Sequence, residues 1–417
     1  MRILYLHQYF TTPSMRGGGR TYEFGRRLAA AGHEVHMLTS DKSGLAQAVP
    51  DGSSAWSIST EAGMTVHWTP VAYDNRMGFA ERLSAFGQFA TLAAARAIAV
   101  GGDLVLATST PLTIALPAVL ASKRLGVPMV FEIRDLWPAV PIAMNILRSR
   151  PTIFAARTLE RFAYRNAAHI VALSPGIRDH VVATGYPSQR ISVIPNGSDF
   201  DLFAIEDHAV AAFRSRHDWL GDRPLIAYVG AISRANGVEW LVELAARMRE
   251  RAPELRFLLV GDGRDTEAVL ALARQRGVLD RTLFYFPPVP KQAVPEILGA
   301  ATLAAVCFID VEVLHTGSPN KAFDAFAAGT PVLMNFGGWL GERVRQYGAG
   351  IVAEHRDLDA TASEIMDLLA DPQAISAARA GARRLGREQF ARDDLAHQLE
   401  QVLLEAACGS EVPCPTG

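Results

Sequence analysis

Cysteine is scarce in this sequence, and no apolar run is long enough to cross a membrane. Only 3 cysteines occur in 417 residues, which excludes a disulfide framework and makes a reducing cytoplasm the expected compartment. The most apolar stretch, 86–120, is interrupted by Arg96 and Asp103, so an integral membrane protein is not expected. Residues 1–10 enter a strand pattern without the features of a secretory leader. Peripheral attachment to the inner face of a plasma membrane stays open.

Net charge is also small, and its distribution is uneven. The formal charge of -2 argues against a generally basic nucleic-acid-binding protein. Residues 1–205 carry 19 Lys and Arg against 14 Asp and Glu, a net +5, whereas the remainder carries 22 against 29, a net -7. Opposite charges indicate two domains that meet different partners. The 11 histidines lack the spacings of zinc sites, so no metal is expected.

Short aliphatic strands alternate with helical patterns in two series. The first series ends at 191–194, and the rhythm pauses around 203–224 before it restarts at 225–229. Continuous apolar strands separated by helices are typical of parallel βαβ units. The sequence therefore predicts an α/β protein with two Rossmann-like domains, a last helical segment and a flexible tail. Their expected limits are 1–204, 205–386, 387–407 and 408–417.

Glycine-rich loops follow three of the predicted strands. The first, Arg16–Arg20, joins three glycines to two arginines before a helix, which favours an anion at the helix N-terminus. It matches neither a dinucleotide fingerprint nor a P-loop, and a flexible turn is the alternative. The loops 230–237, which holds Arg234, and 261–263 lie where the carboxyl edge of a second sheet is expected. Each alone is typical of an ordinary turn, but together they favour a ligand.

The stretch 318–332 carries the most chemical information. Ser318 is predicted to cap a helix whose first turn contains Pro319. The amides of Asn320 and Lys321 then point outward beside a lysine charge, which suits a diphosphate. Asp324, one turn further, can accept hydrogen bonds from a ribose diol. The alternative interpretation is a capped amphipathic helix with an exposed Lys–Asp pair.

Four segments together carry a family resemblance that spans essentially the whole chain. They are G-G-G-R at 17–20, P-N-G-S-D-F-D-L-F at 195–203, L-L-V-G-D-G at 258–263 and A-F-D-A-F-A-A-G-T-P-V at 322–332. This succession resembles glycosyltransferase family 4. The resemblance implies the GT-B fold, with two Rossmann-like domains facing across a cleft and the helix 387–407 returning to the first domain. It also implies retaining transfer from a nucleotide-sugar held mainly by the second domain, without a metal or other cofactor.

The family's donor-binding signature is only partly kept. Its two glutamates correspond to Thr316 and Asp324, so the resemblance implies a ribose contact from Asp324 and loses the donor-sugar contact at Thr316. The backbone of Gly317, Ser318, Pro319 and Asn320 is expected to reach the diphosphate or the sugar, with the amides of the three residues other than proline as donors.

The family's phosphate-binding Arg and Lys are also replaced, by Ala231 and Asn236, which leaves Arg234 and Lys321 as the available cations. Lys321 is the first choice, because charge must be neutralised on the leaving diphosphate. Further donor contacts implied along the loops are Gly18, Gly19, Gly230, Arg234, Asn236, Gly263 and Val289.

The first domain offers a charged cluster after the strand at 128–133. Glu132, Arg134 and Asp135 suit an acceptor hydroxyl, and Asp135 or Glu132 could take its proton. Many family members have His-Asp where this chain has Arg134-Asp135. A structural ion pair is one alternative, and deprotonation by the leaving phosphate, with no dedicated base, is another. The D-x-D at 199–201 follows a Pro-Asn-Gly turn and is interpreted as turn and cap residues rather than a metal site.

The segment 76–96 has apolar residues at helical spacing and arginines nearby. Its apolar positions are Phe79, Leu83, Phe86, Phe89 and Leu92, and its arginines are Arg76, Arg82 and Arg96. Such a helix can rest on an anionic membrane and present a lipid-linked acceptor. A core-packed helix is the alternative.

The sequence and this resemblance thus predict a cytoplasmic, membrane-peripheral retaining glycosyltransferase that uses a UDP-linked donor. With Thr316, Ala231 and Asn236 at these positions, the chain resembles a branch of the family that builds bacterial surface polysaccharides such as O-antigen, capsule or exopolysaccharide. That branch includes transferases of N-acetylated deoxy-sugars. The expected acceptor is a saccharide or a polyprenyl-diphosphate-linked saccharide. Two rivals are a GT-B-like sugar-nucleotide epimerase and a non-catalytic sugar-nucleotide-binding scaffold.

Overall fold

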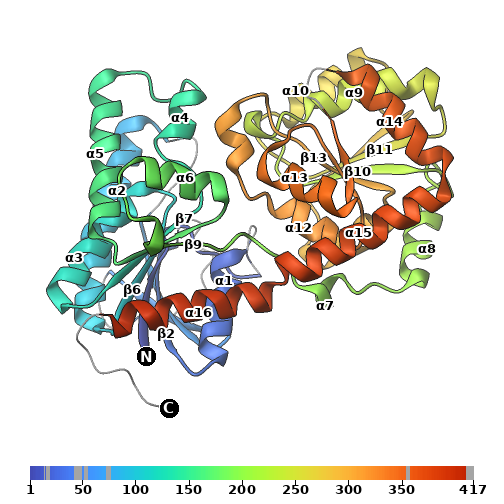
Figure 1. The fold of residues 1–417 in the computed structure, drawn as a ribbon. Coiled ribbons are helices and arrows are strands. Elements are labelled where there is room, and N and C mark those ends of the chain that lie inside the picture. The colour runs from blue at the N-terminus through green and yellow to red at the C-terminus, as the bar shows by residue number, and fades with distance from the viewer. Residues whose placement is uncertain are drawn as a thin grey trace. The chain divides into compact units, whose positions relative to one another are not determined.

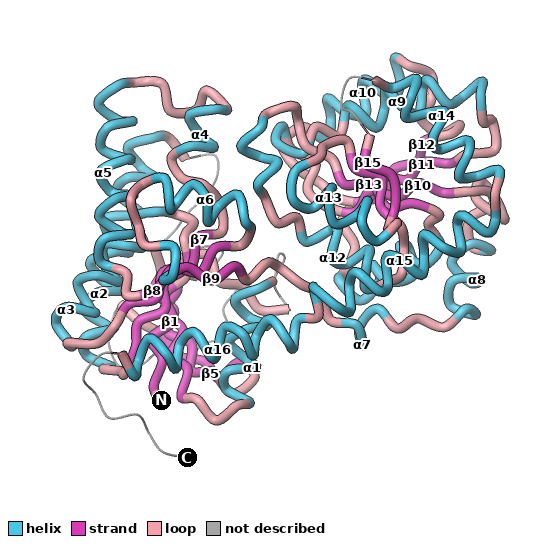
Figure 2. The backbone as a smooth tube through the Cα atoms, in the orientation of Figure 1, coloured by secondary structure: helices cyan, strands magenta, loops and turns pink. Residues whose placement is uncertain are grey.

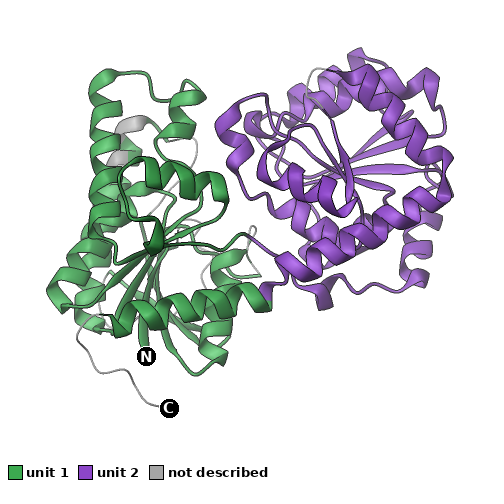
Figure 3. Ribbon diagram, in the orientation of Figure 1, with its two compact units in different colours: residues 1–195, 393–417 green, residues 196–392 purple. Residues whose placement is uncertain are grey.

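A computed structural model describes residues 1–13, 15, 19–41, 49–50, 55–71, 77–353 and 357–409. The chain divides into two compact units (Figure 3), of which unit 1 comprises 1–195 with 393–417 and unit 2 comprises 196–392. The predicted division after 204 lies nine residues beyond that of the structure, and the one before 387 lies six residues ahead of it. The second difference arises because one helix, 372–390, ends in unit 2 before the chain re-enters unit 1. Residues 410–417 of the predicted tail lie outside the described residues.

Unit 1 is built on a sheet whose described strands follow the order β3-β4-β5-β2-β1-β6-β7-β8-β9 (Figure 2). The strands from β5 to β9 in that order pair in parallel, whereas β3 and β4 are antiparallel additions at one edge. Their bounds are β1 Arg2–Leu6, β2 Glu34–Ser40, β3 Val49–Pro50, β4 Ser57–Glu61, β5 Met64–Thr69, β6 Leu104–Thr108, β7 Met129–Ile133, β8 His169–Ala172 and β9 Ile191–Val193.

Helices cover both faces of this sheet (Figure 1). One core contains Ile3 and Tyr5 of β1, Phe24 of α1 and Leu399 of α16, so the last helix of the chain completes the first unit. On the other face α2 packs against α3, and α3 packs against α5. The helices are α1 Arg20–Ala30, α2 Phe79–Val100, α3 Ala115–Leu125, α4 Ala139–Ala143, α5 Arg150–Asn166, α6 Pro175–Ala183 and α16 Arg392–Cys408.

Unit 2 contains a six-stranded, wholly parallel sheet in the order β12-β11-β10-β13-β14-β15. The strands are β10 Leu225–Val229, β11 Arg256–Val260, β12 Leu283–Phe286, β13 Leu303–Val306, β14 Val332–Met334 and β15 Gly350–Val352. The helices are α7 Phe200–Phe203, α8 Asp207–Ser215, α9 Glu239–Arg251, α10 Thr266–Gln275, α11 Val294–Ala300, α12 Asn320–Ala327, α13 Gly338–Tyr347, α14 Leu358–Ala370 and α15 Pro372–Phe390.

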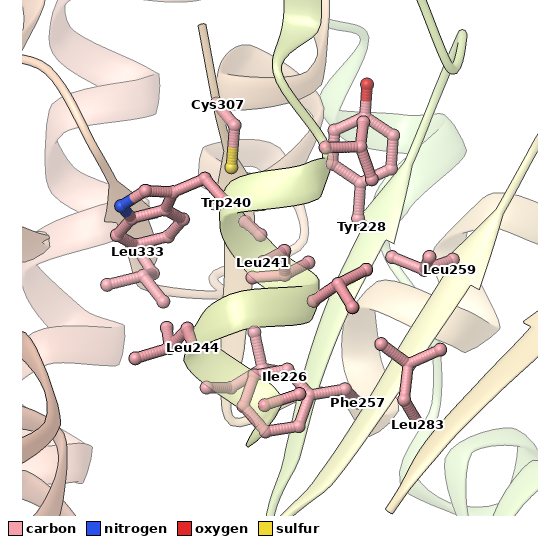
Figure 4. Packing of buried hydrophobic residues seen from close by; sticks show 14 of the residues in the cluster. Ile226, Tyr228, Trp240, Leu241, Leu244, Phe257, Leu259, Leu283, Cys307 and Leu333 are labelled. Atoms are coloured by element: carbon pink, nitrogen blue, oxygen red, sulfur yellow. The ribbon is translucent and has the colours of Figure 1, made fainter. Parts of the chain in front are cut away.

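The core of unit 2 explains why its strands are apolar on both faces. Leu241 and Leu244 of α9 pack on alternate residues of β10 and β11, including Ile226 and Phe257 (Figure 4). The other face is filled by α12, α13 and α15. Tyr228 belongs to the first of these cores, near the end of β10, and it connects the core to the candidate site.

Among the described residues, no helix is both long and apolar enough to span a bilayer.

Candidate active site

Lys321 lies in the first turn of α12, close to the carboxyl end of β10. Its Nζ donates hydrogen bonds to the hydroxyl of Tyr228 at 2.9 Å and to Oδ1 of Asn236 at 2.7 Å. The ammonium also lies 4.5 Å from the centre of the Tyr228 ring. Within the described part of the chain it has no carboxylate partner. A cation positioned by neutral groups is available to an incoming anion.

Burial makes this cation unusually easy to deprotonate. Loss of hydration lowers the pKa of Lys321 to about 8. The neighbouring thiol of Cys307 does not supply a counter-charge, because burial raises the pKa of Cys307 to about 12. Near neutral pH the site therefore holds a mostly protonated lysine with an unmet demand for negative charge.

The start of α12 differs from the predicted cap. Pro319 occupies the N-cap position and no side chain caps the helix, which begins at Asn320. The Ser318 hydroxyl instead accepts a hydrogen bond from the Asn196 amide at 2.9 Å, and the Asn196 side chain donates to the Ser318 carbonyl at 2.7 Å. The prediction of a Ser318 cap is wrong, because the Asn196 amide takes its oxygen. The amides of Asn320 and Lys321 donate to no acceptor in the described chain.

The segment before α12 is fixed by internal hydrogen bonds. The Thr316 hydroxyl donates to the Val313 carbonyl at 2.8 Å. The Gly317 amide donates to Leu314 at 3.0 Å, and its carbonyl accepts from the Trp339 indole at 2.9 Å. The Gly317 amide is therefore already hydrogen-bonded within the protein. Of the backbone amides that were expected to bind a ligand, only those nearer α12 remain available.

The carboxylate of Asp324 already has partners within unit 2. Its carboxylate accepts a hydrogen bond from the Ser198 hydroxyl at 2.8 Å and forms an ion pair with Lys291. The residue is 8% exposed, and the Lys291 ammonium also lies 5.0 Å from the Phe203 ring. The alternative of an exposed pair between Lys321 and Asp324 is thereby excluded. A ribose contact from Asp324 would have to share an oxygen with these partners.

Two loops at the same edge come unusually close. The Gly230 amide donates to the Val260 carbonyl at 2.9 Å, and the Ile232 amide donates to Asp262 at 3.0 Å, so the strand pairing continues into the loops. A side chain on Gly261 would place its Cβ 1.9 Å from the Gly230 carbonyl, and one on Gly263 would lie 2.0 Å from that of Ile232. These glycines permit backbone contact, which explains Gly263 without a ligand.

Other predicted donor residues border the lysine. A Cβ on Gly230 would lie 3.3 Å from Cε of Lys321, so this glycine makes room for the lysine. Asn236 holds the ammonium and donates to the Ala231 carbonyl at 3.0 Å. Arg234 is exposed, and among the described residues its side chain has no hydrogen-bond or ion-pair partner. Val289 packs at the margin of the core and contributes no polar group.

Glu132 in unit 1 is an internal counter-ion. It is 0% exposed, and it pairs with Arg20 at 2.8 Å and accepts from the Thr108 hydroxyl at 2.7 Å. Arg20, the first residue of α1, also donates to the Pro195 carbonyl at 2.5 Å. The prediction that Glu132 takes an acceptor proton is corrected, because both of its oxygens are used and buried.

Asp135 and Arg134 lie beyond the end of β7. The Arg134 amide donates to Ser109 at 3.0 Å, and its guanidinium lies 3.3 Å from Nε2 of His7. Asp135 is an exposed residue, and the protein atoms packed around its carboxyl group desolvate that group in part. This desolvation raises the pKa of Asp135, while the Arg134 charge and a hydrogen bond with Thr110 act in the opposite direction. Of the three first-domain candidates, Asp135 retains the exposure and basicity of a proton acceptor.

Several predicted positions have other outcomes. Gly18 and Arg76 lie outside the described residues, and Gly19 precedes α1 without a side-chain cap. Phe89 of α2 is 1% exposed, and Arg96 hydrogen-bonds His67 at 3.0 Å, so this part of α2 packs in the core as the alternative interpretation expected.

Asp199 of the D-x-D pairs with Arg392, and no metal-binding cluster occurs among the described residues.

Three residues of the unit 2 site were not predicted from the sequence. Tyr228 positions Lys321, Lys291 pairs with Asp324, and Asn196 holds the segment before α12. Asn196 and Ser198 belong to the Pro-Asn-Gly-Ser motif, whose sequence signal was interpreted as a turn. Tyr228 and Lys291 carry no local signal, since their partners are 93 and 33 residues away.

Comparisons with known proteins agree over both units. A family model described as "Glycosyl transferase 4-like domain" matches residues 17–197, and one described as "Glycosyl transferases group 1" matches 223–371. The putative colanic acid biosynthesis glycosyl transferase WcaI of Escherichia coli is 24% identical over 91% of this chain and 96% of its own. The alpha-maltose-1-phosphate synthase of Mycolicibacterium smegmatis is 30% identical over 68% of this chain and 74% of its own.

A solved structure shares the fold. The complex of Anabaena HepE with UDP and glucose has a TM-score of 0.71 at 17% identity, covering 97% of this chain and 99% of that one. Each of the two units is built on a mainly parallel sheet covered by helices, and the last helix of the chain completes the first unit. Together with these matches, this architecture defines a glycosyltransferase of the GT-B fold. Within that class, the chain belongs to glycosyltransferase family 4.

Proposed function

We propose that this glycosyltransferase transfers a sugar, with retention of configuration, from a UDP-linked donor to a saccharide or polyprenyl-diphosphate-linked acceptor in bacterial surface-polysaccharide synthesis. The observation that carries the donor site is the Lys321 ammonium, held by Tyr228 and Asn236 beside the unbonded amides of α12. The name of WcaI, which refers to colanic acid biosynthesis, and the UDP and glucose bound to HepE support the choice of pathway class and donor.

The chemistry requires positive charge where the nucleoside diphosphate leaves. Negative charge grows on the diphosphate as the glycosidic bond breaks, and preorganised donors stabilise it without rearranging. Lys321 is held in place before the donor arrives, and the amides of Asn320 and Lys321 add the positive end of the α12 dipole. Arg234 supplies a second cation without a competing partner in the described chain. In this proposal the chain's own groups neutralise the diphosphate, and no metal or other cofactor takes part.

The acceptor side is assigned to unit 1. Asp135 is exposed, and its raised pKa makes it a better proton acceptor than an ordinary aspartate. Thr110, its hydrogen-bonding neighbour, has φ of 105°, a conformation that β-branched residues rarely adopt. Strained residues of this kind concentrate at functional sites. Asp135 is therefore the residue of unit 1 proposed to meet the acceptor hydroxyl.

The decisive experiment combines a panel of UDP- and GDP-sugars with and without lipid-linked and soluble saccharide acceptors. We expect release of nucleoside diphosphate only when an acceptor is present, and a product with the donor's anomeric configuration. Asp135→Asn should lower turnover at least tenfold, whereas Asp179→Asn, an exposed aspartate of the same unit, should not. Epimer formation without acceptor would support the epimerase, and binding without turnover would support the scaffold.

A further inference from the structure

Large apolar side chains are exposed mainly on one part of unit 1. Among the described residues, the exposed large hydrophobics that fall between 116 and 162 outnumber those elsewhere in the chain. They are Leu116 at 44%, Leu120 at 50%, Ile146 at 65%, Phe154 at 73% and Phe162 at 37% exposed. Phe154 and Ile146 are the most exposed of these, and they fall in one part of the sequence with three further exposed apolar residues, which indicates an interaction surface rather than scattered surface variation.

The outer face of α5 combines aromatic and cationic side chains. Phe154 and Phe162 lie two helical turns apart on that face, and Arg157, Arg161 and Arg165 are exposed beside them. The opposite face is buried at Glu160, Ala163 and Tyr164. An amphipathic helix normally turns its aromatic residues toward the core. Helix α5 instead exposes these two phenylalanines on the face that points away from the core.

Glu160, the acidic residue of α5, lies on the buried side of the helix. Glu160 is 4% exposed and accepts hydrogen bonds from the Tyr164 hydroxyl at 3.1 Å and from His180 at 2.9 Å. The carboxylate of Glu160 is therefore hydrogen-bonded inside unit 1 and does not lie on the outer face of α5. The exposed charges of α5 are all positive, so the face combines apolar area with a single sign of charge.

The neighbouring helix α3 extends this face. α3 packs against α5, and Figure 1 shows both on the same outer side of unit 1. Leu116 and Leu120 are exposed on α3, followed by exposed Lys123 and Arg124. Helix α3 contains no acidic residue. We call the surface formed by the outward residues of α3, α5 and Ile146 the α3–α5 face.

The chemistry of this face fits one kind of partner. Phenylalanine, leucine and isoleucine enter the boundary between headgroups and acyl chains, while arginine contacts lipid phosphates and keeps its charge in water. Each basic residue near an anionic bilayer strengthens the attraction to it, so the basic residues of this face act together. An anionic lipid surface matches both the charge and the apolar area. A protein partner would need a complementary acidic rim around an apolar pocket.

We propose that the α3–α5 face seats this glycosyltransferase on an anionic bilayer, with Phe154 and Ile146 inserted and the arginines of α5 on lipid phosphates. The proposal deepens the proposed function, on which it rests for the lipid-linked acceptor, and it moves the membrane contact from the segment 76–96 to α3 and α5. Vesicle binding needs no donor or turnover, so it tests the surface independently of the reaction.

The test is co-sedimentation of the full chain with vesicles of phosphatidylglycerol and phosphatidylcholine, and with phosphatidylcholine alone, at low and high salt. We expect binding to the anionic vesicles only, weakened by salt. The triple variant Arg157→Gln, Arg161→Gln, Arg165→Gln should bind at least tenfold more weakly, and Phe154→Ser several-fold more weakly. All altered side chains are exposed, so circular dichroism and thermal unfolding should match the parent.

Matched controls lie in unit 2. The triple variant Arg247→Gln, Arg249→Gln, Arg251→Gln changes the net charge equally on the exposed face of α9, and Met366→Ser removes an apolar side chain that is 38% exposed. Both should bind vesicles within twofold of the parent. Equal loss in the two triple variants would overturn the proposal, because net charge alone would explain binding. Absence of vesicle binding, with a dimer that Phe154→Ser dissociates, would also overturn it in favour of a second copy. Transfer to a soluble acceptor should be unchanged in all four variants.

Discussion

Each unit places a cation in the first turn of a helix close to its sheet, but the two cations have opposite surroundings. Arg20 of α1 in unit 1 faces the buried carboxylate of Glu132 at 2.8 Å. Lys321 of α12 in unit 2 faces the neutral oxygens of Tyr228 and Asn236. The same local geometry thus gives a closed ion pair in one unit and an open cation in the other.

The surroundings of the two cations separate a structural charge from a functional one in this fold. A fully buried charge with a matched partner is satisfied, and removing the partner leaves an uncompensated charge. A cation held by neutral groups is already desolvated and oriented, but its charge is unmet, so a ligand's anion completes the site. We therefore expect changes at Glu132 to affect folding and changes at Lys321 to affect turnover.

The largest expected effect is on the stability of unit 1. Glu132→Gln keeps the side-chain shape but leaves Arg20 charged and buried, which should destabilise the protein by about 3–5 kcal/mol. The change in stability can be measured by denaturant unfolding, or by thermal unfolding in a calorimeter. Glu23→Gln, which removes a partner of the more exposed Arg26 and Arg27 from the same helix, should cost about 1 kcal/mol or less.

A double variant sharpens this prediction. Arg20→Met with Glu132→Leu removes both charges, and it should recover much of the lost stability because neither remains buried alone. If Glu132→Gln were as stable as Glu23→Gln, the ion pair would not be the internal anchor of unit 1.

The second effect is on catalysis. Lys321→Met removes the ammonium but keeps an unbranched side chain of similar length, and kcat/KM should fall about 100- to 1,000-fold. Unfolding should show equal or greater stability, because the desolvated charge is gone. Arg274→Met, which changes an exposed arginine of α10, is the matched control and should leave both quantities unchanged. Loss of folding together with activity would mean that Lys321 is structural and that the comparison with Arg20 fails.

The fold class and the position of Lys321 were readable from sequence because both depend on local patterns. Continuous apolar strands and the helix at 320–327 follow from short-range periodicity and from Pro319. The family resemblance supplied the GT-B fold, since periodicity alone indicates two α/β domains. The Arg20–Glu132 pair was missed because 112 residues separate the partners.

The Lys291–Asp324 pair was missed for the same reason, and this explains why Asp324 was assigned to ribose alone. The exposed face of α5 was missed for a different reason. Its aromatic residues look like core positions in a helical pattern, and only the packing of Glu160, Ala163 and Tyr164 shows which side is inward.

The third prediction uses pH to separate catalysis from stability at the same residue. The pKa of Lys321 is about 8, so kcat/KM should fall above pH 8, approaching tenfold per pH unit as the free enzyme loses the proton. Stability should change in the opposite direction. Because the folded pKa lies below the unfolded value of about 10.4, the unfolded chain binds more protons between these values, and stability rises with pH there.

The Lys321→Met variant isolates this contribution, since buried tyrosines also titrate at high pH. The stability difference between the parent and the variant should shrink from pH 8 to 9.5, and the residual activity of the variant should lose its inflection near 8. An unchanged inflection in the variant would assign the titration to another group.

The smallest expected effect concerns Arg234, which is exposed and lacks a partner among the described residues, whereas Lys321 is held by two. An unanchored cation loses side-chain freedom when it binds, so its net contribution is smaller than that of a prepositioned one. Arg234→Gln should raise KM for the donor about three- to tenfold, with little change in kcat, because a charge that contacts the ground state and the transition state alike affects binding alone. Raised salt should reduce this difference between Arg234→Gln and the parent, since exposed charges are screened, but it should leave the effect of Lys321→Met largely intact. Arg234→Gln could instead lower kcat as strongly as Lys321→Met does. The exposed arginine would then stabilise the charge on the leaving diphosphate as well as the lysine does. In that case the orientation of Lys321 by Tyr228 and Asn236 would not be what makes it the functional cation of unit 2.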